Sequence, residues 1–114
     1  MTSDDHYKLG VALASQGDVA RAIDALEEAL EHDRDHGGAC KLLAKLCLKI
    51  NERRAFANWC HEASRIDPDD PEPYEMMAEE LERAGRKAEA NEARQAAERR
   101  LPQSPQRSTS TKQL

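Results

Sequence analysis

The sequence predicts an all-α protein, a superhelical stack of three helix-turn-helix units, on the evidence of two repeating series of residues. Large apolar residues recur every 34 positions, and residue types that best tolerate positive φ, the backbone state that turns one helix into the next, keep the same period. The first series is Leu9, Leu43 and Met77, and the second is Gly17, Asn51 and Gly85. One helical hairpin cannot bury its apolar stripe alone, so we expect the three units to stack with one concave face.

The first unit is predicted to contain helices over residues 5–15 and 19–31. Gly17 ends the first helix, and Asp18 is placed to cap the second. Residues 19–31 carry apolar side chains on one stripe and carboxylates on the other, which is typical of an amphipathic surface helix.

The second and third units follow the same plan. The polar stretch HDRDHGG precedes a predicted helix over residues 39–50, and Asn51 turns the chain into a helix over 53–66. Pro68 cannot continue that helix, and Asp70 with Pro71 is expected to cap the next one, over residues 72–84. A last helix over 87–100 ends before Pro102. The predicted domain is therefore 3–102, in units 3–36, 37–70 and 71–102, and residues 103–114 are expected to form a disordered tail.

Composition limits the classes of partner. The net charge is −5 and the pI is about 5.4, which disfavours nucleic acid and anionic lipid. There is no recognisable export signal and no run of about 18 apolar residues, so no membrane span is expected. Three cysteines, an odd number, predict free thiols in a reducing compartment, and therefore a cytoplasmic protein.

The repeats resemble the tetratricopeptide family, whose 34-residue pattern has recurring large and small apolar positions and a proline at the end. The matching residues are Leu9, Gly10, Leu13, Ala22, Leu26 and Ala29 in unit one, Leu43, Ala44, Cys47, Cys60, Ala63 and Pro68 in unit two, and Met77, Ala78, Leu81, Ala90, Ala97 and Pro102 in unit three. Arg34, Phe56 and Arg94 depart from the pattern. The resemblance implies a right-handed α-solenoid that binds peptide segments or partner proteins, and no catalysis.

The resemblance also implies that the first helix of each unit lines the groove, and helical spacing then names the candidate partner-binding residues. They are Tyr7, Lys8 and Val11 in unit one, Lys41, Leu42, Lys45, Leu48 and Lys49 in unit two, and Glu75, Met76, Glu79 and Glu82 in unit three, with Ala14, Ser15 and Glu72 on the same faces. A basic stripe thus lies beside an acidic one. One interpretation is a bipolar groove that binds a ligand of both charges. The other is that the stripes only solvate the helices or pair across the repeat boundary.

One mode of binding known in the family is not expected here. Members that capture the free carboxylate of chaperone tails use lysine and asparagine at slots that this chain fills with Tyr7, Val11, Leu42, Glu72 and Met76. None of the five suits a carboxylate, and Glu72 would repel one.

No catalytic or metal-binding motif stands out from the repeat pattern. His32, His36 and Cys40 are spaced four apart, but the stretch between them is predicted to be a turn, so no metal site is expected. Cys40, Cys47 and Cys60 fall on apolar stripes and are expected to be buried and structural. Trp59 is expected to cap the core between units two and three, with a partner contact on the convex side as the alternative.

These observations predict a protein-interaction adaptor without cofactors, which binds another protein in its concave groove. The alternative is a structural assembly subunit that self-associates through its superhelix ends. A monomer is favoured and a homo-oligomer is left open, and the solution mass distinguishes the two.

Overall fold

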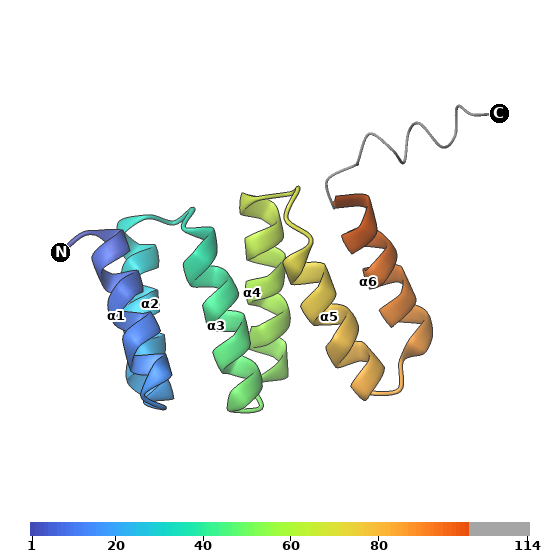
Figure 1. Cartoon of the computed structure of the whole chain (residues 1–114), viewed down its shortest axis with the longest axis horizontal. Helices are drawn as coiled ribbons and strands as arrows, with labels where there is room; N and C mark the ends of the chain where they lie inside the picture. Colours follow the sequence, from blue (N-terminus) through green and yellow to red (C-terminus); the bar gives the residue numbers. More distant parts are fainter. Residues whose placement is uncertain (101–114) are drawn as a thin grey trace.

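Six helices form three antiparallel hairpins in the computed structural model, which describes residues 1–100 (Figure 1). The helices are α1 (Ser3–Ser15), α2 (Val19–His32), α3 (Gly37–Lys49), α4 (Arg53–Ile66), α5 (Glu72–Arg83) and α6 (Lys87–Arg100). The described part of the chain contains no strand, and the hairpins form a right-handed superhelical stack. The predicted tail, 103–114, lies outside the described residues.

Two helices begin earlier than the sequence predicted, because local caps extend them. The Thr2 side chain accepts from Asp5 N while the Asp5 carboxylate accepts from Thr2 N, a capping box that starts α1 at Ser3. His36 Nδ1 accepts from Ala39 N at 3.1 Å, which starts α3 at Gly37. Asp70 accepts from Glu72 N and α5 begins at Glu72, as predicted, with Pro71 in the N-cap position.

The same turn closes all three hairpins. Gly17, Asn51 and Gly85 have φ values of 84°, 64° and 80°, as the 34-residue series predicted. The next residue donates its N–H to the carbonyl five positions back in each case, with N···O distances of 2.8–2.9 Å. This is the hydrogen bond of a Schellman motif, so the period in sequence corresponds to a repeated helix stop.

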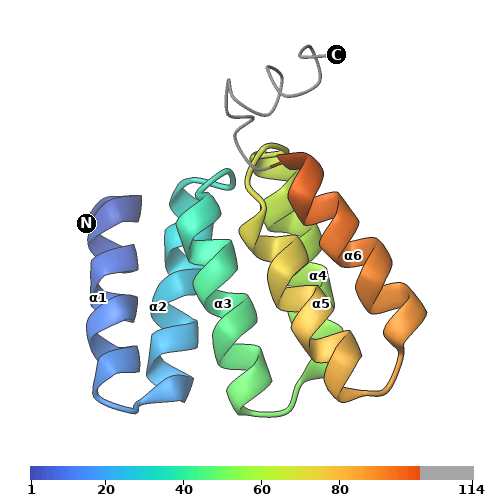
Figure 2. The same ribbon diagram turned by 45° about the vertical axis from the view of Figure 1, so that its right-hand side comes forward.

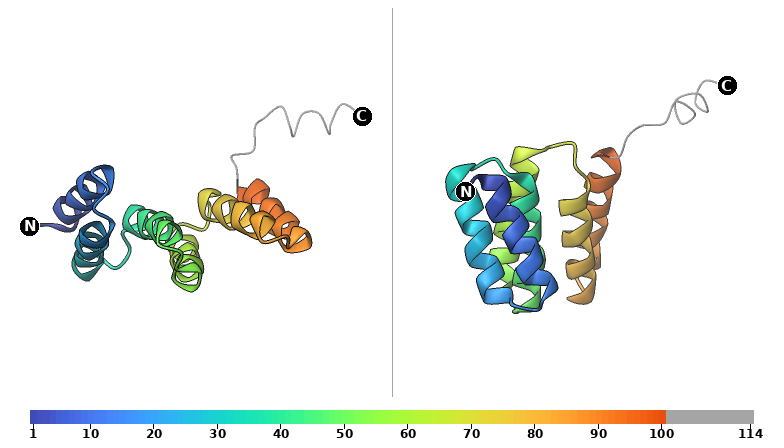
Figure 3. Two further views of the ribbon diagram at one scale, coloured as in Figure 1. Left: turned by 90° about the horizontal axis from the view of Figure 1, so that it is seen from below. Right: turned by 60° about the vertical axis from the view of Figure 1, so that its left-hand side comes forward.

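The hairpins lie side by side along the 55 Å axis of the molecule, and each packs on the next (Figure 3). Helices α1, α3 and α5 are the first members of the pairs, and Figure 2 shows them in succession along one side. None of the helices within residues 1–100 has both the length and the apolar character needed to cross a bilayer.

Three fully buried leucines lie between hairpins one and two. Leu26, Leu43 and Leu46 are at most 2% exposed and form one cluster with Ala22, Ala29 and Ala39. A second cluster of Ala44, Cys47, Phe56 and Cys60 receives Met76 and Met77 from α5. The prediction for Trp59 was too narrow, because this half-buried ring packs against both clusters instead of only the core between units two and three.

At Gly10, helix α1 packs closely against α2. A Cβ atom on this residue would lie 2.7 Å from both Cγ and Cδ2 of the fully buried Leu26. Glycine therefore sets the spacing of the first hairpin.

Hairpin three has a much smaller interior. Its helix α6 buries only Ala90 and Ala97, against Pro73 and Ala78 of α5. Two contacts at the periphery join the helices, an ion pair of Arg94 with Glu82 at 2.6 Å and the Arg100 guanidinium 4.2 Å above the Tyr74 ring. Small side chains and surface contacts hold this hairpin together.

Candidate partner-binding groove

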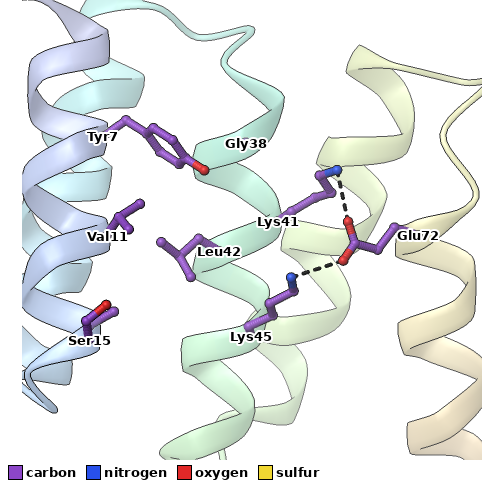
Figure 4. Close-up of a pocket in the computed structure, with 9 residues that line it drawn as sticks. Tyr7, Val11, Ser15, Gly38, Lys41, Leu42, Lys45 and Glu72 are labelled. Carbon is purple, nitrogen blue, oxygen red and sulfur yellow. Dashed lines mark ion pairs between the residues drawn. The ribbon is translucent and has the colours of Figure 1, made fainter.

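A cavity of about 470 Å³ opens between α1 and α3 and reaches the start of α5 (Figure 4). The lining residues of α1 recur at helical spacing and so share one face of that helix, and the lining residues of α3 form the opposite wall. The lining residues are Tyr7, Val11, Ala14, Ser15, Gly38, Lys41, Leu42, Lys45 and Glu72. Tyr7 and Val11 of α1 and Leu42 of α3 make the wall apolar where hairpins one and two face each other.

The Tyr7 ring lies across the first turn of α3. Its centroid is 4.7 Å from that of His36, and a Cβ on Gly38 would come within 3.3 Å of Tyr7 Cζ. His36 is itself held by Asp4, whose carboxylate lies 3.1 Å from Nε2. The absence of a side chain at Gly38 therefore makes room for the aromatic ring at the top of the cavity.

Two lysines of the wall are joined to acidic residues of the next hairpin. Lys41 Nζ lies 2.8 Å from Asp70 and 3.0 Å from Glu72, and Lys45 Nζ lies 3.0 Å from the other oxygen of Glu72. Figure 4 shows Glu72 between the two ammonium groups. Pairing across the repeat boundary, one of the two interpretations of the stripes, is thus present for Lys41 and Lys45.

These contacts shift the titration of the paired groups. Hydrogen bonds from Lys41 and Lys45 lower the pKa of Glu72. Partial burial alone would raise the pKa of Asp70, but the hydrogen bonds from Lys41 Nζ and Glu72 N outweigh it and the pKa falls. For Lys41, desolvation works against the charged form and the two carboxylates outweigh it, so the pKa rises. All three groups are therefore ionised at neutral pH, and Lys45 supplies the second positive charge that balances the two carboxylates.

A second cavity of about 350 Å³ adjoins the first and shares Lys45 and Glu72 with it. Its remaining walls come from Leu48 of α3 and from Glu75, Met76 and Glu79 of α5. Glu75 and Glu79 are exposed and form no ion pair with any residue between 1 and 100. The uncompensated charge of the groove is therefore negative and lies on hairpin three.

The two cavities bring together all but three of the twelve candidate residues. The exceptions are Lys8, Lys49 and Glu82. Lys8 follows Tyr7 by one residue, a rotation of about 100° around the helix that takes it off the cavity wall. Lys49 is exposed at the last turn of α3, and Glu82 is paired with Arg94 of α6. These three predicted residues therefore lie off the walls of the two cavities.

Sequence reasoning missed Gly38 and Asp70. The polar stretch that contains Gly38 predicts only a turn, whereas in the structure Gly38 faces the Tyr7 ring of the preceding hairpin. Asp70 was assigned only a capping role, and its contact with Lys41 depends on how α3 and α5 pack, which residue spacing does not give.

The cysteines are buried as predicted, and all three are free thiols. Burial raises the pKa of Cys40 to about 11 and that of Cys60 to about 12, and it raises the pKa of Cys47 as well. Thiols in this state are protonated and poor nucleophiles at neutral pH.

The structure gives His32, His36 and Cys40 separate surroundings, although their spacing resembles that of metal ligands. His36 caps α3 and contacts Asp4, Cys40 is buried inside α3, and His32 stacks on His6 of α1 with the ring centroids 5.1 Å apart. The three residues form no common site.

Comparison with known proteins supports this architecture. The sequence model of the tetratricopeptide repeat matches residues 13–80, more than half of the 114-residue chain. No curated protein sequence gives a match.

Several solved structures are similar at low sequence identity. MamA has a TM-score of 0.83 and 21% identity over 87% of this chain, which spans only 58% of the MamA chain. The translocator chaperone SycD of Yersinia enterocolitica type III secretion has a TM-score of 0.81 and 17% identity, covering 96% of this chain and 82% of its own. The second TPR domain of Spaghetti (RPAP3), solved with the HSP90 peptide SRMEEVD, has a TM-score of 0.76 and 16% identity, covering 85% and 90%. At these identities the likeness shows the fold.

Proposed function

Because this chain belongs to the tetratricopeptide repeat family, we propose that it is a protein-interaction adaptor whose concave groove binds an extended or helical segment of a partner protein. The role is binding without catalysis and without a cofactor. The three free thiols fit a reducing compartment, and the proposed location is the cytoplasm.

The single observation that carries the proposal is the continuity of the groove. Two adjoining cavities follow α1, α3 and α5, and they offer an apolar wall at one end and free carboxylates at the other. A peptide segment that runs along these helices can fill both cavities. Recognition by apolar contact and charge together is the usual basis of specificity in such grooves.

The chemistry of the groove favours a particular ligand. Lys41 and Lys45 are already compensated by Asp70 and Glu72, so a bipolar ligand with an acidic stretch at hairpin two is disfavoured. The proposed segment carries an apolar side chain for Tyr7, Val11 and Leu42 and basic side chains for Glu75 and Glu79. This revises the ligand that the charge stripes alone predict.

The peptide bound by the RPAP3 domain provides a contrast. SRMEEVD carries three carboxylate side chains and one arginine. In this chain it would meet the uncompensated Glu75 and Glu79, so we expect it not to bind.

The proposal is tested with an immobilised library of random peptides and the full chain. We expect the bound sequences to combine lysine or arginine with large apolar residues. The double substitution Glu75→Lys and Glu79→Lys should reverse the charge preference. Glu92→Lys, on an exposed position of α6 that lines neither cavity of the groove, is the matched control and should leave the preference unchanged. Two results would rule out the groove as the site. One is binding of peptides without a charge preference, and the other is a charge preference that Glu92→Lys changes as much as the double substitution does.

Self-assembly is the second candidate, and one observation favours it. Leu9 is 43% exposed on the outer side of hairpin one, beside a cavity lined in part by Leu13 and Ala25. An assembly subunit would cover these residues with a second copy. Sedimentation equilibrium distinguishes the candidates, because an adaptor remains at the mass of one chain across the concentration range and an assembly subunit does not.

A further inference from the structure

Two histidines and a glutamate converge at the outer end of hairpin one, away from the groove. They are His6 of α1 and Glu28 and His32 of α2, and their candidate ligand atoms all lie within 4.8 Å of one another. We propose that these three side chains bind one zinc-class divalent metal ion. Imidazole nitrogen and carboxylate oxygen are common zinc ligands, and two of the former with one of the latter form a known donor set.

The placement of the ligands on two packed helices fixes the backbone positions of the site. Glu28 and His32 are one turn apart on α2, so their side chains lie on one face of the helix. His6 faces them from α1, and its ring is nearly parallel to that of His32, with an interplanar angle of 15°. The capping box of Thr2 and Asp5 fixes the first turn of α1, and the hairpin turn fixes its antiparallel register with α2.

A small side-chain adjustment completes the geometry. In a tetrahedral zinc site the ligand atoms are about 3.3 Å apart, given Zn–N distances of about 2.0 Å. Glu28 and His32 are exposed and free to rotate about their side-chain bonds, while His6 is half-buried and provides the fixed ligand. Three protein ligands leave one coordination position for water.

The electrostatic surroundings attract a cation. The adjoining cavity of about 500 Å³ is lined by four carboxylates, those of Asp24, Glu27, Glu28 and Glu31, and by one cationic side chain, Arg21. His32 lies in the last turn of α2, where the helix dipole is negative. The positive N-terminus of α1 lies at the same end but is offset by Asp4 and Asp5 in its first turn.

The other two histidines do not belong to the site. His36 is engaged by Asp4 and Ala39 N, and His61 is exposed on α4 without an ion pair to any residue in 1–100. His61 therefore provides a matched control. The inference departs from the expectation of no metal site, which considered only histidines and cysteines that are close in sequence.

The test is titration of the full chain, with its thiols kept reduced, by zinc chloride in a calorimeter near neutral pH. We expect one zinc ion per chain, with binding weakened at least tenfold by His32→Ala and by His6→Ala and unchanged by His61→Ala. Zinc should also raise the Tm of the wild type and of His61→Ala, but not that of His32→Ala. Cobalt(II) in place of zinc should give a spectrum without thiolate charge-transfer bands, because Cys40, Cys47 and Cys60 are not ligands.

Three results would overturn the assignment: no binding of zinc, equal binding by His32→Ala, or thiolate bands in the cobalt spectrum. Circular dichroism without zinc checks that each variant folds. If His6→Ala does not fold, the test uses the substitutions at the two exposed ligands, His32→Ala and Glu28→Gln. The groove variant that combines Glu75→Lys and Glu79→Lys should bind zinc normally, so the tests of the metal site and of the peptide groove are independent.

Discussion

Helix α3, the first helix of the middle hairpin, and α6, the second helix of the last hairpin, differ sharply in the side chains that they bury. Helix α3 buries Ala39, Cys40, Leu43, Ala44, Leu46 and Cys47, whereas α6 buries only Ala90 and Ala97. Both belong to hairpins closed by the same positive-φ turn. The comparison teaches that turn residues fix the architecture of each unit, while the volume of the buried side chains fixes how much each unit contributes to stability.

The largest effect is expected from truncating the centre of the leucine cluster. Leu43→Ala removes a side chain with no exposed surface and leaves a cavity, so the free energy of unfolding should fall by about 2–5 kcal/mol. Urea denaturation followed by circular dichroism measures the change. Ala88→Gly, on an exposed position of α6, tests the other side of the comparison and should cost about 1 kcal/mol or less. Equal losses for both variants would contradict the comparison.

The next effect is expected where hairpin one is packed most tightly. Gly10→Ala places a methyl group against Leu26 Cγ, which cannot move because Leu26 is fully buried. We expect a loss of about 1–3 kcal/mol from overpacking, measured in the same denaturation assay. A neutral Gly10→Ala would mean that α1 separates from α2 at little cost, and that hairpin one is as loosely held as hairpin three.

Hydrogen exchange of the unmodified chain compares the hairpins directly. Helix α6 buries little apolar area, so its amides should exchange through local opening at least roughly tenfold faster than those of α3 and α4. Mass spectrometry of peptic fragments resolves the three helices. Uniform protection along the array would show that it opens as one cooperative unit, and strong protection of α6 in a concentration-dependent dimer would favour the assembly candidate.

The smallest effect concerns the ion pairs that join hairpins two and three. Lys41→Met leaves Asp70 and Glu72 without their shared partner and should cost about 1 kcal/mol at neutral pH, since the groups are only partly exposed. Folding lowers the pKa of Asp70 below its ordinary value of 3.8 and that of Glu72 below 4.5. The two ionised carboxylates therefore stabilise the folded state above these ordinary values, and this stabilisation is lost as the pH falls through the lower folded pKa values.

The difference between Lys41→Met and the wild type should therefore shrink in acid, below about pH 4. Thermal denaturation across the acid range measures it. Lys49→Met is the control, because Lys49 is exposed and has no ion pair with a residue in 1–100. If the stability difference between Lys41→Met and the wild type stays constant at low pH, the effect comes from lost packing of the aliphatic part of Lys41 and not from its ion pairs.

Much of the fold could be predicted from local chemistry. The helix stops at Gly17, Asn51 and Gly85 depend on the backbone of a single residue, and the apolar stripes depend on helical spacing. The early start of α3 could not be predicted, because it depends on which nitrogen of His36 faces the Ala39 amide.

The candidate site was predicted less completely, for a physical reason. Helical spacing gives the face on which Lys41 and Lys45 lie, but their partners come from a loop and a helix of the next hairpin. The meeting of His6 and His32 likewise requires the antiparallel register of α1 and α2. Glu28, one turn before His32, was the local signal that went unused.

The ion pairs of Lys41 and Lys45 also bridge hairpins two and three on the groove side of the stack. They lie on the concave rim between hairpins two and three, while the apolar contacts of Phe56 and Met77 join the same hairpins behind them. Charges that are partly exposed are screened by salt, and buried methyl and aromatic groups are not. High ionic strength should therefore weaken the ion pairs on the groove side of this junction and leave the apolar contacts behind them unchanged. We expect the arc of the stack to widen and the molecule to lengthen as salt is added.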